Sequence, residues 1–149
     1  MGLMKKLSII ISILLLSCSA VVAESNEPKK EEIVLDYQLV NHIEFELVFS
    51  QSEEQYCVYF YSKTCGHCEL LKSDIISFAL EDNEPFYFVD FTDLHFYGSK
   101  KDLTGVSSIE DFYIFGTPFL IVINNRAIIE YYYGVNLIRE YIASKKSQS

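Results

Sequence analysis

The hydrophobic residues of this chain gather in segments whose spacing predicts alternating strands and helices. Residues 56–61 form a continuous run of aromatic and β-branched residues around one cysteine, the pattern of a strand buried on both faces. Leu71, Ile75 and Phe78 then recur at i, i+4 and i+7, which predicts an amphipathic helix. Residues 86–91 repeat the strand pattern, so the order predicts a βαβ unit with two parallel strands.

The C-terminal third predicts a hairpin followed by a helix. The apolar residues 119–123 and 127–133 flank Asn124-Asn125-Arg126, and asparagine tolerates the positive φ of a tight hairpin turn. Gly134 ends the second of these strands. The closing helix is indicated by four apolar residues and by two lysines near its negative end: Leu137, Ile138, Tyr141, Ile142, Lys145 and Lys146. The predicted fold class is α/β, with a central mixed sheet (βαβ followed by ββα) flanked by helices.

Two segments have less regular patterns. In residues 33–49 some apolar residues fit helical spacing and others fit alternation, and we expect a strand followed by a helix. Residues 92–111 are polar and contain Gly98 and Gly105, which favours a loop with a short helix before Gly116.

The N-terminus has the pattern of an export signal. Lys5 and Lys6 precede an apolar run over residues 7–16 and then small residues, which predicts an extracytoplasmic protein, periplasmic or at the cell surface. Cleavage after Ala23 fits this pattern. Alternatively, Leu15-Leu16-Ser17-Cys18 resembles a bacterial lipoprotein box, in which a lipidated Cys18 would tether the chain to the membrane. An uncleaved anchor is a third alternative, although the run is shorter than the roughly 20 residues of a spanning helix.

The rest of the chain divides into three parts. Residues 24–32 are charged and polar, as in a flexible leader, residues 33–146 form one predicted domain, and 147–149 are a tail. All 21 acidic residues lie beyond residue 23, and the whole chain has a net charge of −9. An acidic surface repels phosphate backbones, so we expect no nucleic acid partner.

Cys65-Gly66-His67-Cys68 is the motif that indicates chemistry. It follows a predicted buried strand and opens a predicted helix, the setting of redox-active cysteine pairs. At a helix N-terminus, free N–H groups and the helix dipole lower the pKa of a cysteine from about 8.5. His67 would stabilise the thiolate further. Such a pair carries electrons as a disulfide, so we expect no metal and no organic cofactor.

Other uses of a CxxC motif have little support here. A structural zinc site needs further ligands at paired spacing, and Cys57, His42 and His95 do not provide them. Haem attachment requires histidine directly after the second cysteine, where Glu69 stands. We expect Cys57 to be a small buried hydrophobic residue, and both isolated histidines to lie partly exposed at the surface.

The chain resembles the thioredoxin superfamily over residues 33–146. The resemblance rests on the CxxC motif and its setting, on Thr117-Pro118 before a strand and on Gly134 after the hairpin. The resemblance implies that Pro118 is cis, lies against the cysteine pair and, with Thr117, positions a substrate strand. It also implies that Cys65 is the nucleophile and Cys68 resolves the mixed disulfide. The Gly-His dipeptide is similar to that of protein disulfide isomerases, which implies oxidation or isomerisation rather than reduction.

The expected protein is therefore a monomeric thiol–disulfide oxidoreductase that acts on protein cysteines and is reset by a redox partner. Three departures from the family stand out: Thr64 replaces the usual tryptophan, Tyr59 replaces a buried acid whose lysine neighbour we place at Phe86, and residues 92–115 are longer than in the smallest members. These departures keep a second hypothesis open, a noncatalytic accessory or binding module at the membrane with a structural Cys65–Cys68 disulfide.

Overall fold

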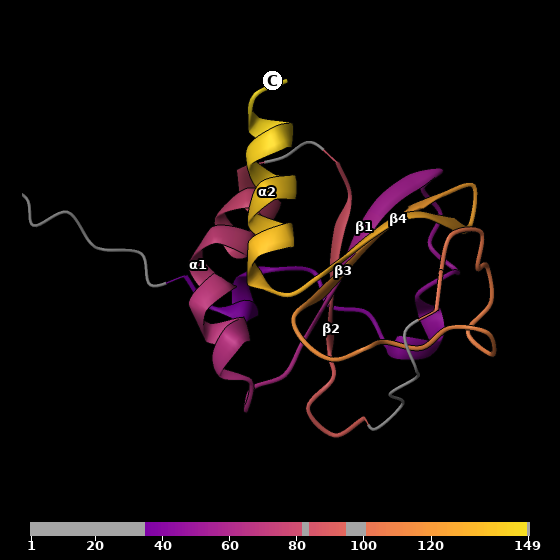
Figure 1. Ribbon diagram of the computed structural model, residues 1–149, viewed down its shortest axis with the longest axis horizontal. Coiled ribbons are helices and arrows are strands. Elements are labelled where there is room, and N and C mark those ends of the chain that lie inside the picture. The colour runs from indigo at the N-terminus through magenta and orange to yellow at the C-terminus, as the bar shows by residue number, and fades with distance from the viewer. Residues whose placement is uncertain (1–34, 82–83, 95–100, 149) are drawn as a thin grey trace, which may run out of the picture. The chain divides into compact units, whose positions relative to one another are not determined.

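The computed structural model describes residues 35–81, 84–94 and 101–148, all of them within one compact unit, Ile33–Ser149 (Figure 1). The predicted export signal, the lipidation of Cys18, the leader and His95 lie outside the described residues. Within those residues, no helix is both long and apolar enough to cross a membrane.

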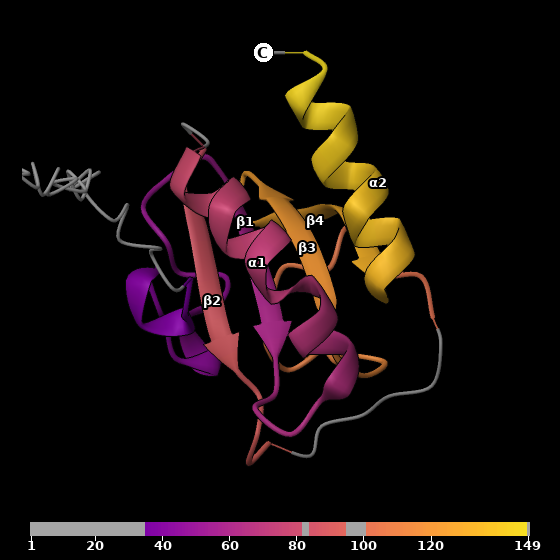
Figure 2. The same cartoon turned by 90° about the vertical axis from the view of Figure 1, so that its left-hand side faces the viewer.

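Four strands form one mixed sheet in the order β2-β1-β3-β4 (Figure 2). β1 (Gln55–Tyr61) pairs in parallel with β2 (Phe86–Asp90) and antiparallel with β3 (Phe119–Asn124). β3 continues into β4 (Ala127–Tyr133) as an antiparallel hairpin. The predicted βαβ unit and the hairpin are confirmed, as is the burial of β1 on both faces.

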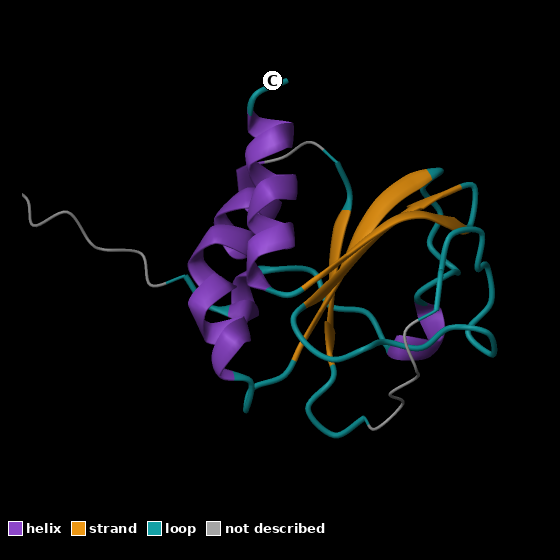
Figure 3. Cartoon of the chain, in the orientation of Figure 1, coloured by secondary structure: helices purple, strands orange, loops and turns teal. Residues whose placement is uncertain are grey.

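Both α-helices pack on one face of the sheet (Figures 1 and 3). These are α1 (Gly66–Glu81) and α2 (Val135–Lys146). Their apolar residues share one buried cluster with alternate side chains of the strands, such as Leu71 and Ile138 with Tyr59. The predicted spacings therefore correspond to buried faces of both helices, except that Leu137 of the predicted closing helix is 48% exposed.

The opposite face of the sheet is covered by irregular segments (Figure 3). Phe45, Phe112 and Ile114 pack there against Val58 and Phe60 of β1. The short helix expected in residues 92–111 is absent from the part of that segment that the structure describes. At Thr104 the backbone N–H bonds to a side chain, that of Asp102, at 2.9 Å. Such local bonds compete with helix formation.

The prediction of a strand followed by a helix in residues 33–49 is also wrong. Two short 3₁₀ helices occur instead, η1 (Tyr37–Leu39) and η2 (Phe45–Leu47). The strand is reduced to one parallel bridge between His42 and Phe88. Leu39 and Leu47 are each 47% exposed, so part of the apolar spacing that suggested a helix does not mark a buried face.

The turn between β3 and β4 has two central residues with positive φ. Asn125 has φ 49° and Arg126 has φ 64°, as in the two-residue turns that match the twist of a hairpin. The predicted role of asparagine is confirmed, and the arginine adopts the same region. The hairpin brings Gly134 back beside Pro118, whose carbonyl accepts a hydrogen bond from the Gly134 N–H at 3.0 Å.

Candidate functional site

The two cysteines lie where β1 gives way to α1. The Cys65 N–H donates to the Ser62 carbonyl at 3.1 Å, which turns the chain into the helix. Cys65 thereby takes the position before the first helical residue, and its sulfur accepts the N–H of Cys68 at 3.2 Å. This is how a capping side chain satisfies the free N–H groups of a helix N-terminus.

The loop before β3 lies against this sulfur. The Thr117–Pro118 peptide is cis, as the family resemblance implied. The Cys65 thiol donates to the Thr117 carbonyl at 3.3 Å. Residues 52 positions apart in the sequence thus meet at the reactive atom.

Cys68 is more deeply buried than Cys65, and its burial affects its protonation. Its exposed fraction is 1%, while Cys65 is only half-buried. Burial, followed by its interaction with the Cys65 thiol, raises the pKa of the Cys68 thiol well above its ordinary value. At neutral pH Cys68 therefore stays protonated and must lose its proton before it can attack a disulfide.

Tyr59, at the position where the family has a buried acid, is completely buried beneath the cysteines. Among the described residues its hydroxyl makes no hydrogen bond of ordinary geometry, although it lies close enough to the Tyr37 hydroxyl to interact with it. Burial raises the pKa of Tyr59 far above its ordinary value, so Tyr59 remains neutral and cannot replace a carboxylate base. Its neighbour on β2 is Phe88 and not, as we expected, Phe86, which pairs with Cys57. Tyr59 therefore has no charged neighbour at this position of β2.

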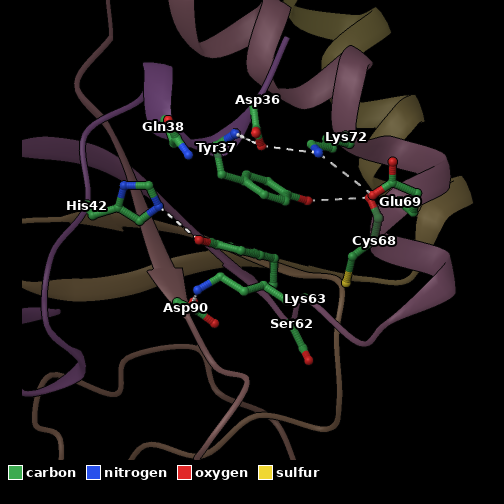
Figure 4. A pocket seen from close by; sticks show the side chains of 11 residues that line it. Asp36, Tyr37, Gln38, His42, Ser62, Lys63, Cys68, Glu69, Lys72 and Asp90 are labelled. Carbon is green, nitrogen blue, oxygen red and sulfur yellow. Dashed lines mark hydrogen bonds and ion pairs between the residues drawn. The ribbon is translucent and has the colours of Figure 1, made fainter. Parts of the chain in front are cut away.

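A polar pocket of about 590 Å³ opens behind Cys68 (Figure 4). Its lining comes from η1 and the residues beside it, from the end of β1 and the loop that follows, from α1 and from the end of β2. It includes two ion pairs, Lys72 with Asp36 at 3.1 Å and Lys63 with Asp90 at 2.6 Å. Cys68 forms part of the wall. The pocket thus gives the solvent a side approach to the buried cysteine.

An aromatic stack that no sequence pattern predicts crosses this pocket. The rings of Tyr37 and Tyr61 stack with centroids 3.8 Å apart, and the Tyr37 hydroxyl donates to the Cys68 carbonyl at 3.4 Å. His42 is exposed, as expected. It is not isolated, because Nε2 lies 3.0 Å from the Tyr61 hydroxyl (Figure 4). Tyr37 comes from the segment without a clear pattern, and no signal in the sequence places it beside Cys68.

A second hollow, of about 700 Å³, lies on the Pro118 side of the cysteines. His67 and Thr117 line it. His67 is exposed, and no hydrogen bond links its ring to another residue in the described part of the chain. Its predicted effect on the Cys65 thiolate stays a prediction. Further along, the hollow is lined by Leu70 of α1 and Leu137 of α2.

Two remaining predictions concern Cys57 and metal binding. Cys57 is buried as expected, and its sulfur lies 3.2 Å from the Tyr141 hydroxyl of α2. The described residues contain no group of three or more potential ligands that could hold a metal ion. The absence of a cofactor stays a prediction.

Comparisons with known proteins agree with this architecture. The Thioredoxin family model matches residues 36–144. A structure of ferredoxin:thioredoxin reductase in complex with thioredoxin f2 contains a chain that is 11% identical, with a TM-score of 0.52, and the match covers 74% of this chain and 96% of that one. Mitochondrial thioredoxin 3 from Saccharomyces cerevisiae is 13% identical, with a TM-score of 0.50 and coverages of 74% and 97%.

A third structure, of Plasmodium falciparum thioredoxin, is 18% identical, with a TM-score of 0.49 and coverages of 70% and 98%. No curated protein matches the chain. The family match covers most of the chain and includes both cysteines, the Thr117–Pro118 loop and Gly134. The chain therefore belongs to the thioredoxin family.

Proposed function

We propose that this chain is an exported thiol–disulfide oxidoreductase that acts on the cysteines of other proteins. The observation that carries the proposal is the unequal environment of the two sulfurs. Cys65 is half-buried, capped by the Cys68 N–H and in contact with the Thr117 carbonyl. Cys68 is buried directly behind it. One sulfur is placed to meet a substrate, and the other is placed to displace it.

The reaction has two exchange steps. The Cys65 thiolate attacks one sulfur of a substrate disulfide, forms a mixed disulfide and releases a substrate thiolate. Cys68 then loses its proton, and its thiolate attacks the Cys65 sulfur, which forms the Cys65–Cys68 disulfide and releases the second substrate thiolate. Both substrate thiolates take up protons, so the substrate gains two electrons and two protons in all. Run in reverse, the same steps oxidise a substrate dithiol.

The second step lacks the acid that the family uses. Tyr59 is neutral and Phe88 is apolar, so neither accepts the Cys68 proton. The pocket behind Cys68 supports another route, because water in it can take the proton toward the carboxylates at its rim, such as Asp36 and Glu69. We therefore expect resolution by Cys68 to be slower than attack by Cys65.

The direction of exchange and the location of the protein are inferred from the sequence. The Gly66-His67 dipeptide resembles that of protein disulfide isomerases, and the N-terminal pattern is that of an exported or lipid-anchored chain. An oxidising compartment favours disulfide formation or shuffling. One of the similar structures holds thioredoxin f2 in complex with a reductase, and we expect a partner protein to reset this chain too. A chain that forms disulfides in its substrates ends with a reduced Cys65–Cys68 pair, so its partner would have to oxidise that pair.

A second candidate function is a noncatalytic module with a permanent Cys65–Cys68 disulfide. The neutral surroundings of Cys68 favour it, because they slow the release of that sulfur's proton. The two candidates differ in redox potential. A structural disulfide has a potential below about −300 mV, and catalytic disulfides lie well above it.

The deciding experiment is a glutathione redox titration of residues 24–149 carrying Cys57→Ser, which removes the spare thiol. A potential well above about −300 mV supports the exchange enzyme. A lower value, together with failure of a Cys68→Ala variant to trap substrates as mixed disulfides through Cys65, would support the noncatalytic module. A Cys65→Ala, Cys68→Ala double variant is the control for trapping.

A further inference from the structure

Two tyrosine hydroxyls near Cys68 lack good hydrogen-bond partners. Tyr59 of β1 is completely buried, and its hydroxyl makes no hydrogen bond of ordinary geometry among the described residues. The Tyr37 hydroxyl of η1 lies 3.4 Å from the Cys68 carbonyl, beyond the range of about 2.5–3.0 Å that is usual for an O–H···O bond. In the dithiol form of the chain, both hydroxyls are therefore donors with weak acceptors or none.

The two hydroxyls and the two sulfurs of the motif interact with one another. Burial raises the pKa of Tyr59, and negative charge on Tyr37, Cys68 or Cys65 raises it further. Burial also raises the pKa of Tyr37, and negative charge on Cys68 adds to that effect. The hydroxyls of Tyr37 and Tyr59 lie close enough to each other for a hydrogen bond to shift both values. Charge that develops on Cys68 therefore acts on both hydroxyls.

The Tyr37 ring is held in place beside Cys68. Tyr61 stacks on it with centroids 3.8 Å apart, and Lys72 Nζ lies over it, 5.3 Å from its centroid. The Asp36 carboxylate accepts the Tyr37 N–H at 2.7 Å and also pairs with Lys72 at 3.1 Å. A donor that is already positioned needs no reorganisation when charge develops next to it.

The buried hydroxyl of Tyr59 calls for an explanation. A buried polar group without a good partner destabilises a fold, and phenylalanine would supply the same ring without that penalty. The Cys68 thiolate is an acceptor that exists only during exchange. A donor that meets its acceptor only in the reacting state accelerates a reaction, because it stabilises that state and not the resting one.

We infer that the Tyr59 hydroxyl turns and donates a hydrogen bond to the Cys68 sulfur as that sulfur loses its proton, while the Tyr37 hydroxyl turns and donates to the Tyr59 oxygen. A hydroxyl that accepts a hydrogen bond becomes a stronger donor. Tyr37 is thus a positioning residue that acts through Tyr59. The inference rests on the proposed function, which supplies the resolving step of Cys68.

Neither tyrosine gains or loses charge in this step. The Cys68 proton leaves through water in the pocket, as in the proposed function. The Cys68 thiolate attacks the Cys65 sulfur, the bond between Cys65 and the substrate breaks, and the substrate sulfur leaves with the electron pair. The Cys68 sulfur is then neutral, and the two hydroxyls return to their resting positions.

Other titratable groups around the pocket also affect the protonation of Cys68. They come from η1, β1, α1, β2 and the segments beside them: Asp36, His42, Tyr61, Lys63, Glu69, Lys72 and Asp90. Four of them form the two ion pairs described above. A change from tyrosine to phenylalanine at position 37 or 59 leaves all of these groups in place, so it tests the hydroxyl alone.

The test follows both exchange steps in one reaction. The full-length chain with Cys18→Ser and Cys57→Ser, in which only the motif thiols react, is reduced and mixed with one equivalent of dithiobis(nitrobenzoate), an aromatic disulfide whose thiolate is coloured. Attack by Cys65 releases one thiolate in a first phase. Displacement by Cys68 releases the other in a second phase, whose rate constant does not depend on concentration. Both phases are measured from about pH 6 to about pH 9.

We expect Tyr59→Phe and Tyr37→Phe each to slow the second phase about threefold and to change the first phase less. A tenfold loss of thiolate gives a threefold effect because the remaining thiolate becomes more nucleophilic, with a Brønsted coefficient of about 0.4–0.5. The pH profile of the second phase should also move to higher pH, which a loss of stability alone would not cause.

Tyr56→Phe is the matched control. Tyr56 is a fully buried tyrosine of the same strand, but its hydroxyl donates to the Val48 carbonyl and its ring packs in the cluster on the other face of the sheet. This variant loses a structural hydrogen bond and should keep both rate constants.

The outcomes separate the hydroxyl pair from the exchange function. A second phase that is unchanged in Tyr59→Phe, or is slowed equally in Tyr56→Phe, would overturn the inference while exchange stands. Slowing in Tyr59→Phe but not in Tyr37→Phe would overturn the role of Tyr37. A parent chain that lacks either phase would overturn the proposed function and the inference together.

Discussion

One substitution, tyrosine to phenylalanine, should change the stability of this protein in opposite directions at two positions of β1. The hydroxyl of Tyr56 is buried and donates to the Val48 carbonyl at 2.8 Å. The hydroxyl of Tyr59 is buried and has no hydrogen-bond partner within the described residues. Both rings are fully buried and are retained in phenylalanine, so the hydroxyl group alone is tested.

The magnitudes follow from the state of each hydroxyl. An intramolecular hydrogen bond contributes about 0.5–1.5 kcal/mol net, so Tyr56→Phe should lower the free energy of unfolding by about 1 kcal/mol. A buried polar group without a partner costs about 1–3 kcal/mol, so Tyr59→Phe should raise that free energy by about 1 kcal/mol or more. With an m-value of about 2 kcal/mol/M in urea, each change moves the unfolding midpoint by about 0.5 M.

The assay is equilibrium urea unfolding of the parent and both variants in excess reductant, so that the cysteines stay thiols throughout. The midpoint of Tyr59→Phe should lie about 1 M above that of Tyr56→Phe, with the parent between them. A Tyr59→Phe midpoint below that of the parent would show that the hydroxyl has a favourable partner, and the nearby Tyr37 hydroxyl would then be that partner.

Two further predictions concern Cys68 and the loop before Pro118. Burial raises the pKa of the Cys68 thiol, so the stability that this thiol contributes is complete below the unfolded-state pKa of about 8.5 and is lost as the pH rises toward the folded-state value. Urea unfolding of the dithiol form from pH 7.5 to 9.5 should show this decline in the free energy of unfolding, and Cys68→Ala should reduce it. An equal dependence of that free energy on pH in the parent and in Cys68→Ala would contradict the argument from burial. Gly116 has φ +147°, and an added Cβ would lie 3.2 Å from the Tyr133 hydroxyl. Gly116→Ala should therefore destabilise the fold by about 1 kcal/mol or more, measured by thermal unfolding. An unchanged unfolding midpoint would show that the loop before Pro118 adjusts freely.

The parts of the fold that the sequence predicts well are those where a regularly spaced set of apolar residues is buried. Residues 56–61 and the Leu71, Ile75 and Phe78 spacing are of this kind, because burial on a strand or a helix face produces the periodicity directly. Residues 33–49 are different. Their apolar positions include exposed leucines as well as buried ones such as Phe45, so the spacing could not show which backbone conformation buries them.

The candidate site divides in the same way. The place of the cysteine pair follows from local pattern, since a buried strand leads directly into an amphipathic helix. The partner of Tyr59 on β2 does not follow from local pattern, because the register between parallel strands depends on how far the crossover returns. An error of two residues in that register led to Phe86 being expected where Phe88 stands. The approach of Tyr37 to Cys68 spans 31 positions and arises only from tertiary packing.

The contacts of η1 with α1 also determine how mechanical force enters the domain. A load on the chain ahead of Leu35 is transmitted through Asp36 and Tyr37, which are held by the Lys72 ion pair and by the hydrogen bond to the Cys68 carbonyl. These contacts join the first described residues to the first turn of α1, and the Tyr37 ring also stacks on Tyr61 at the end of β1. Tension from a tether attached upstream would therefore act first on the surroundings of Cys68 and on the end of the strand that leads to it.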